Sequence, residues 1–320
     1  MKALLLTQPD APLLYTEVAM PQPAEGEVLV QLQAAALNRR DWWITQGKYP
    51  GIIYPIILGS DGVGIAEDRE VIINPAIDWG SAPAYPSKAF QILGLPKNGT
   101  FAEWVAVPQR QLYDKPPHLS MEQAAALPLA GLTAYRALFS KGQLQRGEKV
   151  LISGAGGGVA LFAFQFAIAA GAEVWVTSGS EAKIERAIAM GASGGANYRD
   201  ADWHKNLQTQ SGGFDVIVDG AGGDGFAGFP KICKPGARIV TYGGTLGAVS
   251  GLSPQPVFWK HLSILGTSMG NDQEFADMLE FVNQHKIIPV VDRVFPLSKG
   301  LEAISQMSDS KQFGKLVLSI

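Results

Sequence analysis

A glycine-rich stretch in the middle of the chain constrains the fold more than any other feature. Residues Gly154 to Ala160 read Gly-Ala-Gly-Gly-Gly-Val-Ala, and they join the apolar run Val150–Ser153 to a second one, Leu161–Ala170, which ends at Gly171. This order predicts a strand, a tight turn and a helix. Glycines let the backbone approach a pyrophosphate and direct free N–H groups toward it from the helix N-terminus. The stretch therefore predicts a dinucleotide site.

Two spacings of the dinucleotide fingerprint fit this stretch, each imperfectly. One runs Gly154-x-Gly156 and continues to Val159, and the other, which we favour, runs Ala155-x-Gly157-x-x-Ala160. A glycine turn without a ligand is the alternative interpretation, and the surrounding strand and helix patterns make it the weaker one. The residues expected at the phosphates are Ala155, Gly156, Gly157, Gly158 and Val159.

Apolar runs alternate with helical patterns after Lys149, which predicts a doubly wound parallel sheet. Six strands are expected, near Val150–Ser153, Glu173–Thr177, Ala196–Tyr198, Val216–Asp219, Arg238–Thr241 and Ser263–Leu265. At Ser120 and Gln123, just before this region, the spacing is typical of a capping box that opens a helix. We predict an α/β chain with a Rossmann domain over residues 119–266.

The two ends of the chain are expected to form a second, β-rich domain from residues 1–118 and 267–320. Short β-like runs separated by Gly/Pro turns occur at Val28–Leu32, Glu70–Ile73 and Phe101–Val107. The tail carries a helical pattern around Glu274–Gln284 and strand patterns near Val290–Phe295 and Lys315–Leu318. The Pro-containing segment Asp78–Lys97 lacks periodicity, so we expect an excursion over the surface.

Charge and residue usage disfavour several classes of function. The formal net charge is -3 and no run of Lys or Arg is present, which argues against nucleic acid or an anionic membrane as a partner. The longest apolar stretch, Val159–Val176, is interrupted by polar residues, which indicates a buried helix and strand. A lone Cys233 and four scattered histidines give no disulfide and no metal-ligand spacing. We expect a cytoplasmic protein acting on a small molecule.

The end of the second Rossmann strand predicts which dinucleotide binds. NAD-binding proteins usually carry Asp or Glu there, whereas this chain has Ser178, Gly179 and Ser180, followed by Lys183. Tyr198 and Arg199 close the third strand. A 2′-phosphate would find hydroxyl donors and positive charge among these residues, so NADPH is favoured. Lys183 and Arg199 as ordinary solvated charges are the alternative.

Several separated motifs span nearly the whole chain: Ala35–Asp41, Gly47–Pro50, Leu58–Gly64, Gly99–Glu103, Gly131–Tyr135 and the glycine stretch. Together they resemble one family, the medium-chain dehydrogenases/reductases, and in particular its quinone oxidoreductase and enoyl reductase branches. The resemblance implies a GroES-like barrel domain, a Rossmann domain and a homodimer.

Zinc-dependent members of this superfamily hold a catalytic metal with Cys, His and Cys. The matching positions here are Asn38, Ser60 and about Leu129, and the segment that would carry structural-zinc cysteines, Asp78–Lys97, has none. We therefore expect no metal site and a zinc-independent mechanism, which disfavours alcohol oxidation assisted by a Lewis acid.

The resemblance also assigns roles to individual residues. It implies that Asn38 helps orient the cofactor ribose or a water, that Lys315 reaches the pyrophosphate, and that Asp41 is structural. Packing or a simple turn is the alternative for each. Along the cofactor, the resemblance places Thr133, Ala221, Tyr242, Gly243 and Thr267. Tyr49 is the candidate proton donor, and Trp43 with Tyr49 is expected to line the substrate site.

The resulting prediction is an NADPH-dependent, zinc-independent oxidoreductase that reduces an enone, an enoyl ester or a quinone by hydride transfer. Two alternatives stay open. One is a dinucleotide-binding protein without turnover, of a crystallin-like or regulatory kind, because fold alone does not establish catalysis. The other is an alcohol dehydrogenase-like activity.

Overall fold

The computed structural model describes residues 1–309 and 311–320, and the chain divides into two compact units. Unit 1 contains Met1–Leu132 and Gly270–Ile320, and unit 2 contains Thr133–Met269. Residues 119–132 thus belong to unit 1, whereas the sequence placed them in the Rossmann domain. The reason is that α2 (Met121–Ala125) packs on strands of unit 1, among them β3 (Glu27–Ala36) and β5 (Asp61–Ala66).

Unit 2 is a six-stranded parallel sheet in the order β13-β12-β11-β14-β15-β16. The strands are β11 (Lys149–Ile152), β12 (Glu173–Ser178), β13 (Gly194–Asn197), β14 (Phe214–Asp219), β15 (Cys233–Thr241) and β16 (Ser263–Gly266). In chain order this is 3-2-1-4-5-6, the doubly wound arrangement of dinucleotide-binding domains. All six predicted strands are confirmed, with ends shifted by a few residues.

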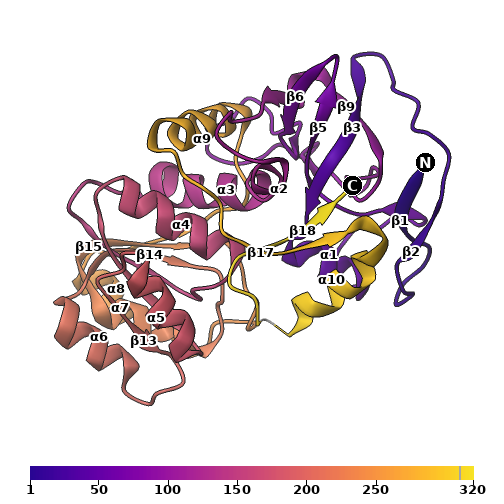
Figure 1. Ribbon diagram of the computed structural model, residues 1–320. Helices are drawn as coiled ribbons and strands as arrows, with labels where there is room; N and C mark the ends of the chain where they lie inside the picture. The colour runs from indigo at the N-terminus through magenta and orange to yellow at the C-terminus, as the bar shows by residue number, and fades with distance from the viewer. Residues whose placement is uncertain (310) are drawn as a thin grey trace. The chain divides into compact units, whose positions relative to one another are not determined.

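Helices connect these strands, as Figure 1 shows for α4 and its neighbours. They are α4 (Gly158–Ala169), α5 (Glu181–Ala189), α6 (Trp203–Ser211), α7 (Phe229–Ile232) and α8 (Pro254–Trp259). Aromatic residues of α6 and α7, Trp203 and Phe229, share one buried cluster with Leu151, Ile217 and Ile239 of the sheet. Burial of this apolar surface holds these helices on the strands.

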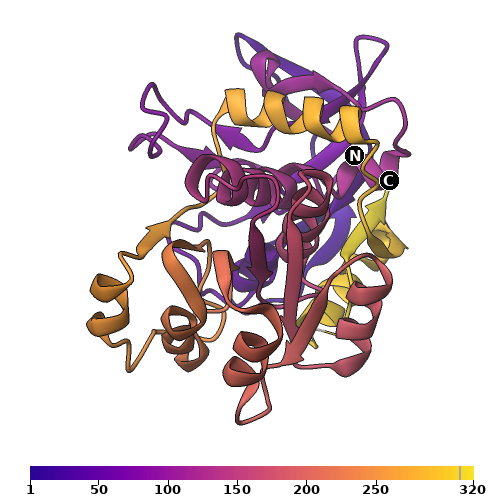
Figure 2. The same ribbon diagram turned by 90° about the vertical axis from the view of Figure 1, so that its left-hand side faces the viewer.

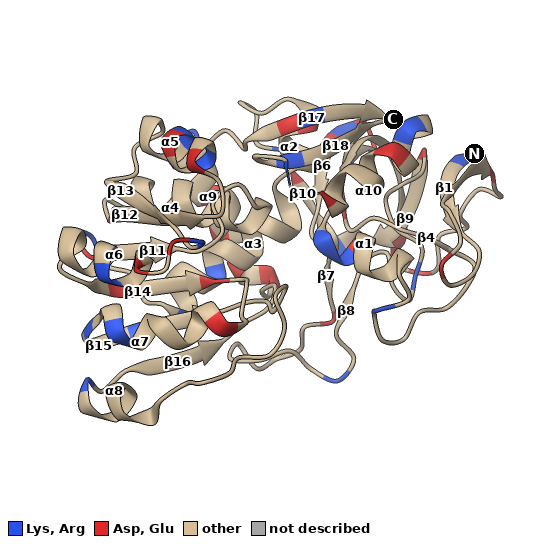
Figure 3. Ribbon diagram, turned by 90° about the horizontal axis from the view of Figure 1, so that it is seen from below, with Lys and Arg blue, Asp and Glu red and all other residues tan. Residues whose placement is uncertain are grey.

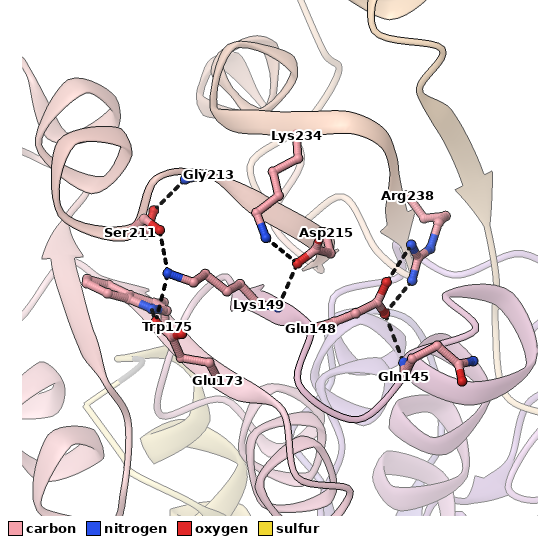
Figure 4. Close-up of polar contacts among 10 residues, drawn as sticks. All are labelled: Gln145, Glu148, Lys149, Glu173, Trp175, Ser211, Gly213, Asp215, Lys234 and Arg238. Atoms are coloured by element: carbon pink, nitrogen blue, oxygen red, sulfur yellow. Dashed lines mark hydrogen bonds and ion pairs between the residues drawn. The ribbon is translucent and has the colours of Figure 1, made fainter.

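Charged side chains tie together the N-terminal ends of the strands of unit 2 (Figure 4). Lys149 Nζ lies 3.3 Å from Glu173 Oε1, and Lys234 Nζ lies 2.6 Å from Asp215 Oδ2. Arg238 makes two bonds to the carboxylate of Glu148, at 2.6 and 3.0 Å. The glycine turn follows β11 at the opposite, C-terminal edge, so this network supports the sheet away from the predicted cofactor site.

Unit 1 is built on a seven-stranded sheet with the path β10-β6-β5-β3-β18-β17, and β9 also pairs with β3. Its further strands are β6 (Arg69–Ile73), β9 (Trp104–Pro108), β10 (Leu112–Asp114), β17 (Val291–Pro296) and β18 (Lys315–Ser319). A smaller sheet contains β1 (Lys2–Leu6), β2 (Leu14–Glu17) and β4 (Ile56–Ile57). The prediction that the tail returns to the first domain is confirmed, since β18 pairs with β3.

The remaining helices of unit 1 are α1 (Arg39–Thr45), α9 (Asp272–His285) and α10 (Gly300–Ser308), and α3 (Pro128–Tyr135) begins in this unit. The gold helix α9 lies against the strands of its unit in Figure 2. Phe275 of this helix contacts the ring of Tyr113, with ring centroids 4.9 Å apart. The expected capping box of α2 is present, because Ser120 and Gln123 bond reciprocally.

The segment Asp78–Lys97 was predicted to be a surface excursion, and this is only partly correct. It contains β8 (Gln91–Ile92), which pairs with β7 (Ala76–Ile77), and it buries Trp79, Leu93 and Leu95. Apolar anchors without a helical or strand period hold the segment on the core. None of the helices in the described part of the chain combines the length and apolarity needed to span a bilayer.

Candidate functional site

Strand register brings three polar residues together in unit 1. Val317 of β18 lies opposite Ala36 of β3 in an antiparallel pair, so continuing the register places Lys315 opposite Asn38, just beyond the end of β3. On its other side, β3 pairs with β5, with Ala36 opposite Asp61. Three strands from distant parts of the sequence therefore converge at one point.

The three side chains form a closed set of hydrogen bonds. Lys315 Nζ donates to Asn38 Oδ1 at 2.6 Å and to Asp61 Oδ2 at 3.0 Å, and Asn38 Nδ2 donates to the same Asp61 oxygen at 2.8 Å. The other Asp61 oxygen accepts the backbone N–H of Leu129 at 2.8 Å. Exposure is 7% for Asn38, 4% for Lys315 and 0% for Asp61. A buried ion pair that several hydrogen bonds hold in this way has a fixed geometry.

A second cation lies beside this set, at the start of α1, where Figure 3 shows a blue segment. Arg40 is buried, with 8% exposure, and its Nη1 donates to Ser60 Oγ at 2.6 Å and to the Leu93 carbonyl at 2.9 Å. Both acceptors are neutral.

Asp41 is the third residue of the same helix and is fully buried. Its Oδ2 accepts the backbone N–H of Asn38 at 2.7 Å, which forms the capping box of α1 and confirms a structural role. Burial raises the pKa of the Asp41 carboxyl to about 6, although the charges of Arg40 and Lys315 and the Asn38 hydrogen bond act in the opposite direction.

The aromatic residues predicted for the substrate site are Trp43, which lies in the same helix, and Tyr49, which follows it. Trp42 and Trp43 meet edge to face with ring centroids 4.5 Å apart. Each of the three rings carries a cation: Arg39 lies over Trp42, Lys48 over Trp43, and Arg40 over Tyr49 at 5.2 Å from the ring centroid. Trp42 and Tyr49 are partly buried against the core of unit 1. The region between Asn38 and Tyr49 is therefore both aromatic and cationic.

The residues present do not fit a zinc ion. Asn38 Oδ1 and Ser60 Oγ, at two of the positions that match zinc ligands, each accept a hydrogen bond from a buried cation, and Leu129 has an aliphatic side chain. In the described part of the chain, no three His, Cys, Asp or Glu side chains gather in a way that could hold a metal ion. Metal binding at this position would bring a further positive charge next to Lys315 and Arg40.

The glycine stretch in unit 2 has the form of a phosphate cradle. Gly154 and Gly156 have φ values of +72° and +108°, which residues other than glycine rarely adopt. Gly157 is the N-cap of α4. Of the predicted phosphate residues, Gly158 and Val159 begin the helix, where free N–H groups face outward. Ala155 instead donates its N–H to the Thr177 carbonyl at 2.8 Å, so its backbone shapes the turn.

Sequence reasoning missed Asp219, at the end of β14. Its carboxylate accepts hydrogen bonds from the Ser153 hydroxyl and, at 2.8 Å, from the Gly222 N–H. It is almost completely buried and joins the ends of two neighbouring strands beside the glycine turn. An acid at the end of an apolar strand was a signal that could have identified it.

The residues predicted to read the adenosine ribose gather after β12. A Cβ on Gly179 would lie 2.6 Å from the Tyr198 hydroxyl and 3.0 Å from Arg199 Nε, so the phenol and the guanidinium close directly over this backbone. The buried Ser178 hydroxyl accepts the Ser180 N–H at 3.3 Å, and Lys183 lies in the first turn of α5, for which Ser180 is the N-cap. The arrangement provides hydroxyl, phenol and cationic groups in one place.

The residues expected along the rest of the cofactor also lie in unit 2. Thr133 is buried near Met269, and the Thr267 hydroxyl is buried without a partner among the described residues. Ala221 follows β14, and Tyr242 and Gly243 follow β15. The ring of Tyr242 lies so close to Gly220 that a Cβ there would be 2.4 Å from it. Burial, and then the charge of Asp219, raise the pKa of the Tyr242 phenol.

The structure therefore groups the predicted residues into two sets. Asn38, Trp43 and Tyr49 lie in unit 1, and the predicted phosphate, ribose and nicotinamide residues lie in unit 2. Lys315, predicted at the pyrophosphate, lies in unit 1, where its ammonium is engaged by Asn38 and Asp61. Sequence reasoning also missed Arg40 and Asp61 as members of the site.

Comparison with known proteins gives matches to both units. Residues 24–117 match the alcohol dehydrogenase GroES-like domain, and residues 158–284 match the zinc-binding dehydrogenase family. The chain is 35% identical to a zinc-type alcohol dehydrogenase-like protein, YogA, of Leptosphaeria maculans, over 97% of this chain and 95% of the relative.

Solved structures show the same likeness. An NAD-dependent alcohol dehydrogenase superposes with a TM-score of 0.94 at 36% identity, covering 100% of both chains. The quinone oxidoreductase of Thermus thermophilus, solved also in complex with NADPH, superposes with a TM-score of 0.85 at 28% identity, again over 100% of both chains. With its Rossmann-like parallel sheet and GroES-like domain, the chain is an oxidoreductase that belongs to the medium-chain dehydrogenase/reductase superfamily.

Proposed function

We propose that this protein is an NADPH-dependent, zinc-independent oxidoreductase that reduces a carbon–carbon double bond conjugated to a carbonyl, or a quinone. The observation that carries the proposal is the chemistry of the Asn38, Ser60 and Leu129 positions. In place of metal ligands they offer an amide and a hydroxyl bonded to buried cations, and an aliphatic side chain. Such a site favours the negative charge that develops on a carbonyl oxygen during conjugate reduction.

NADPH is proposed as the hydride donor, since a bound reduced nicotinamide supplies the hydride in enzymes of this class. Tyr198 and Arg199 above Gly179, with Ser180 and Lys183 nearby, would hold the 2′-phosphate. The absence of Asp or Glu from residues 178–180 removes the usual acceptor for the 2′-hydroxyl of NAD. The N-terminus of α4 would hold the pyrophosphate.

Residues of unit 1 would position the acceptor and deliver the proton. Trp43 offers a ring edge and face for a planar substrate, and Tyr49 offers a phenol that is protonated at neutral pH. The closing step, protonation of the α-carbon, is assigned to Tyr49 or to solvent.

We consider two further candidate functions. One is an alcohol dehydrogenase using NAD, because the solved structure with a TM-score of 0.94 bears that description. The other is a dinucleotide-binding protein without turnover, which shares the fold and the cofactor site.

Fluorescence titration with NADPH and NADH, followed by a panel of enones, quinones and alcohols, separates these functions. We expect tight NADPH binding and turnover of enones or quinones. Turnover of alcohols with NAD⁺ would favour the dehydrogenase, and tight binding with no turnover on any acceptor would favour the binding protein.

We also propose a homodimer formed through the edge of the parallel sheet. Strand β16 ends the strand order of the sheet, with Ile264 exposed on it, and α8 just before it exposes Phe258 and, at 76%, Trp259. Two copies of one edge can pair about a twofold axis, because such an interface is complementary to itself. Sedimentation velocity tests this: Trp259→Glu with Ile264→Lys should give a monomer, and an unchanged sedimentation coefficient would contradict it.

A further inference from the structure

The guanidinium of Arg40 is buried beside the predicted substrate residues, and among the described residues it hydrogen-bonds to no carboxylate. Its exposure is 8%, and its hydrogen bonds go to two neutral groups, the Ser60 hydroxyl and the Leu93 carbonyl. Its Nε is buried and has no hydrogen-bond partner in the described part of the chain. The charge of Arg40 acts on the neighbouring Asp41 carboxyl, but a buried donor without a hydrogen-bond partner, such as this Nε, is costly for a protein to keep. Its presence points to an anion, or to an oxygen that gains negative charge.

Lys315 adds a second cation with spare donor capacity. Its ammonium carries three hydrogens and makes two hydrogen bonds within the described residues, to Asn38 Oδ1 and Asp61 Oδ2. Each cation hydrogen-bonds to a residue at a position that matches a zinc ligand: Arg40 donates to Ser60, and Lys315 donates to Asn38. They therefore stand where the superfamily's metal would supply positive charge.

The nearby carboxylates do not use up this donor capacity. Asp61 accepts from Lys315 and Asn38, and also from the Leu129 N–H, while one Asp41 oxygen accepts the Asn38 N–H. Arg40 and Asp41, neighbours in α1, interact through their charges, but within the described residues Arg40 Nε and Asp41 Oδ1 both lack a hydrogen-bond partner. The neighbouring carboxylates balance charge in the cluster, but none of them occupies the remaining hydrogen-bond donors of the Arg40 guanidinium, which lie in a region of low dielectric where interactions with charge are strong.

We propose that Arg40 and Lys315 together form an oxyanion site that replaces the catalytic metal, and that its ligands are carbonyl compounds whose oxygen becomes an enolate or phenolate. The inference rests on the proposed function and deepens it. As the hydride adds to the β-carbon, a C–H bond forms there and the π electrons of the double bond move toward the carbonyl oxygen. The oxygen becomes negative, the nicotinamide is oxidised, and a proton then adds to the α-carbon. The two cations act during the first step, since preorganised donors stabilise charge as it develops.

An equilibrium measurement with para-nitrophenol tests the site without hydride transfer. Its phenolate absorbs in the visible range and mimics an oxygen bearing the developing charge. We expect the wild-type protein to bind the phenolate more tightly than the phenol, so that the apparent pKa of the bound probe falls by about one unit or more. Equal affinity for the two forms would overturn the proposal, whether or not the protein turns over an enone.

Variants then assign the effect to the two cations. Arg40→Met and Lys315→Met should each weaken phenolate binding about tenfold or more, and Arg40→Lys should retain part of it. Lys311→Met, a change at a lysine with an 81% exposed side chain, is the matched control and should behave as the wild type. Unchanged phenolate binding in both Met variants would remove the cations from the site.

Removing Lys315 alone leaves Asp61 buried without its cation, so this variant can fail to fold. The double variant Lys315→Met with Asp61→Asn removes both charges and replaces the carboxylate with an isosteric amide. It is expected to fold and to have lost the same phenolate affinity. With an enone substrate, Arg40→Met should lower kcat by about a hundredfold at unchanged NADPH affinity. A loss confined to NADPH affinity would instead assign these residues to cofactor binding and overturn the proposal.

Discussion

The ammonium of Lys315 lies 2.6 Å from the side-chain oxygen of Asn38, although 277 residues separate the two in the sequence. The oxygen that would have to face a metal at this position therefore accepts a hydrogen bond from a positive charge. In the same way, the hydroxyl oxygen of Ser60 accepts a hydrogen bond from the Arg40 guanidinium. To bind zinc through Asn38 and Ser60, the protein would have to break both hydrogen bonds and move Lys315 and Arg40 away.

We predict that the purified protein contains no stoichiometric zinc and keeps its activity in a strong chelator. Binding zinc would place a dication beside two buried cations and use an amide and a hydroxyl, which are poor zinc ligands. Elemental analysis of protein prepared in zinc-supplemented medium is the measurement. One tightly bound zinc per chain, with activity lost on its removal, would sink the prediction.

We predict that NADPH binds more tightly than NADH and that Lys183 contributes to the difference. Lys183→Ala should cost roughly 1.5–3 kcal/mol of NADPH affinity, or about ten- to a hundredfold, because a charge-assisted hydrogen bond to the phosphate is lost. The affinity for NADH should change little. Fluorescence titration with each cofactor is the measurement, and Lys205→Ala, on the exposed side of α6, is the control. Equal losses for both cofactors would show that Lys183 does not recognise the phosphate.

Because the pKa of the buried Asp41 carboxyl is raised, we predict that folding stability depends on pH in an unusual direction. Its pKa in the folded protein is about 6 and its ordinary value is 3.8, so between these values the folded state holds a proton that the unfolded chain has released. Folding stability should therefore fall as pH rises from about 4 to about 6, by up to about 3 kcal/mol for this group alone. Above about pH 6 the full cost of the buried, ionised carboxylate is present.

Asp41→Asn tests this, because the amide keeps an oxygen for the Asn38 N–H but does not titrate. Relative to the wild type, the variant should gain stability as pH rises through this window. Urea unfolding at a series of pH values, followed by tryptophan fluorescence, gives the two curves. Parallel curves would mean that Asp41 does not titrate in this range, and Asp200→Asn, at an exposed position, controls for general charge effects.

Local patterns were sufficient to predict most of the fold. The strands of unit 2 are continuous apolar runs bounded by turns, and their alternation with helices dictates a parallel sheet. The boundary near residue 132 was not predictable in this way, because α2 is assigned by its packing on β3 and β5. The buried anchors Trp79, Leu93 and Leu95 carry no period that would have revealed them.

The charged cluster of unit 1 lay beyond sequence reasoning for a related physical reason. Lys315 and Asp61 each appear as a single charge in an apolar strand, which signals that a partner is needed. Which partner it is depends on the register of β18 and β5 on β3, and register is set by tertiary packing. Lys315 was therefore predicted at the pyrophosphate from the resemblance alone.

The last prediction is that Tyr49 donates or relays the proton that follows hydride transfer. Its ring packs on the core of unit 1 and lies under the Arg40 guanidinium, so its position is fixed beside the proposed oxyanion site. A phenol is protonated at neutral pH and can hydrogen-bond to a developing enolate, which makes it a suitable acid. Tyr49→Phe should lower the rate about a hundredfold while leaving NADPH affinity intact.

Tyr54→Phe is the matched control, because Tyr54 packs on the same core and its buried hydroxyl has no partner among the described residues. Assays with a prochiral enone in deuterated solvent report both rate and product configuration. A normal rate with unchanged configuration in Tyr49→Phe would assign the proton to solvent and remove Tyr49 from the mechanism.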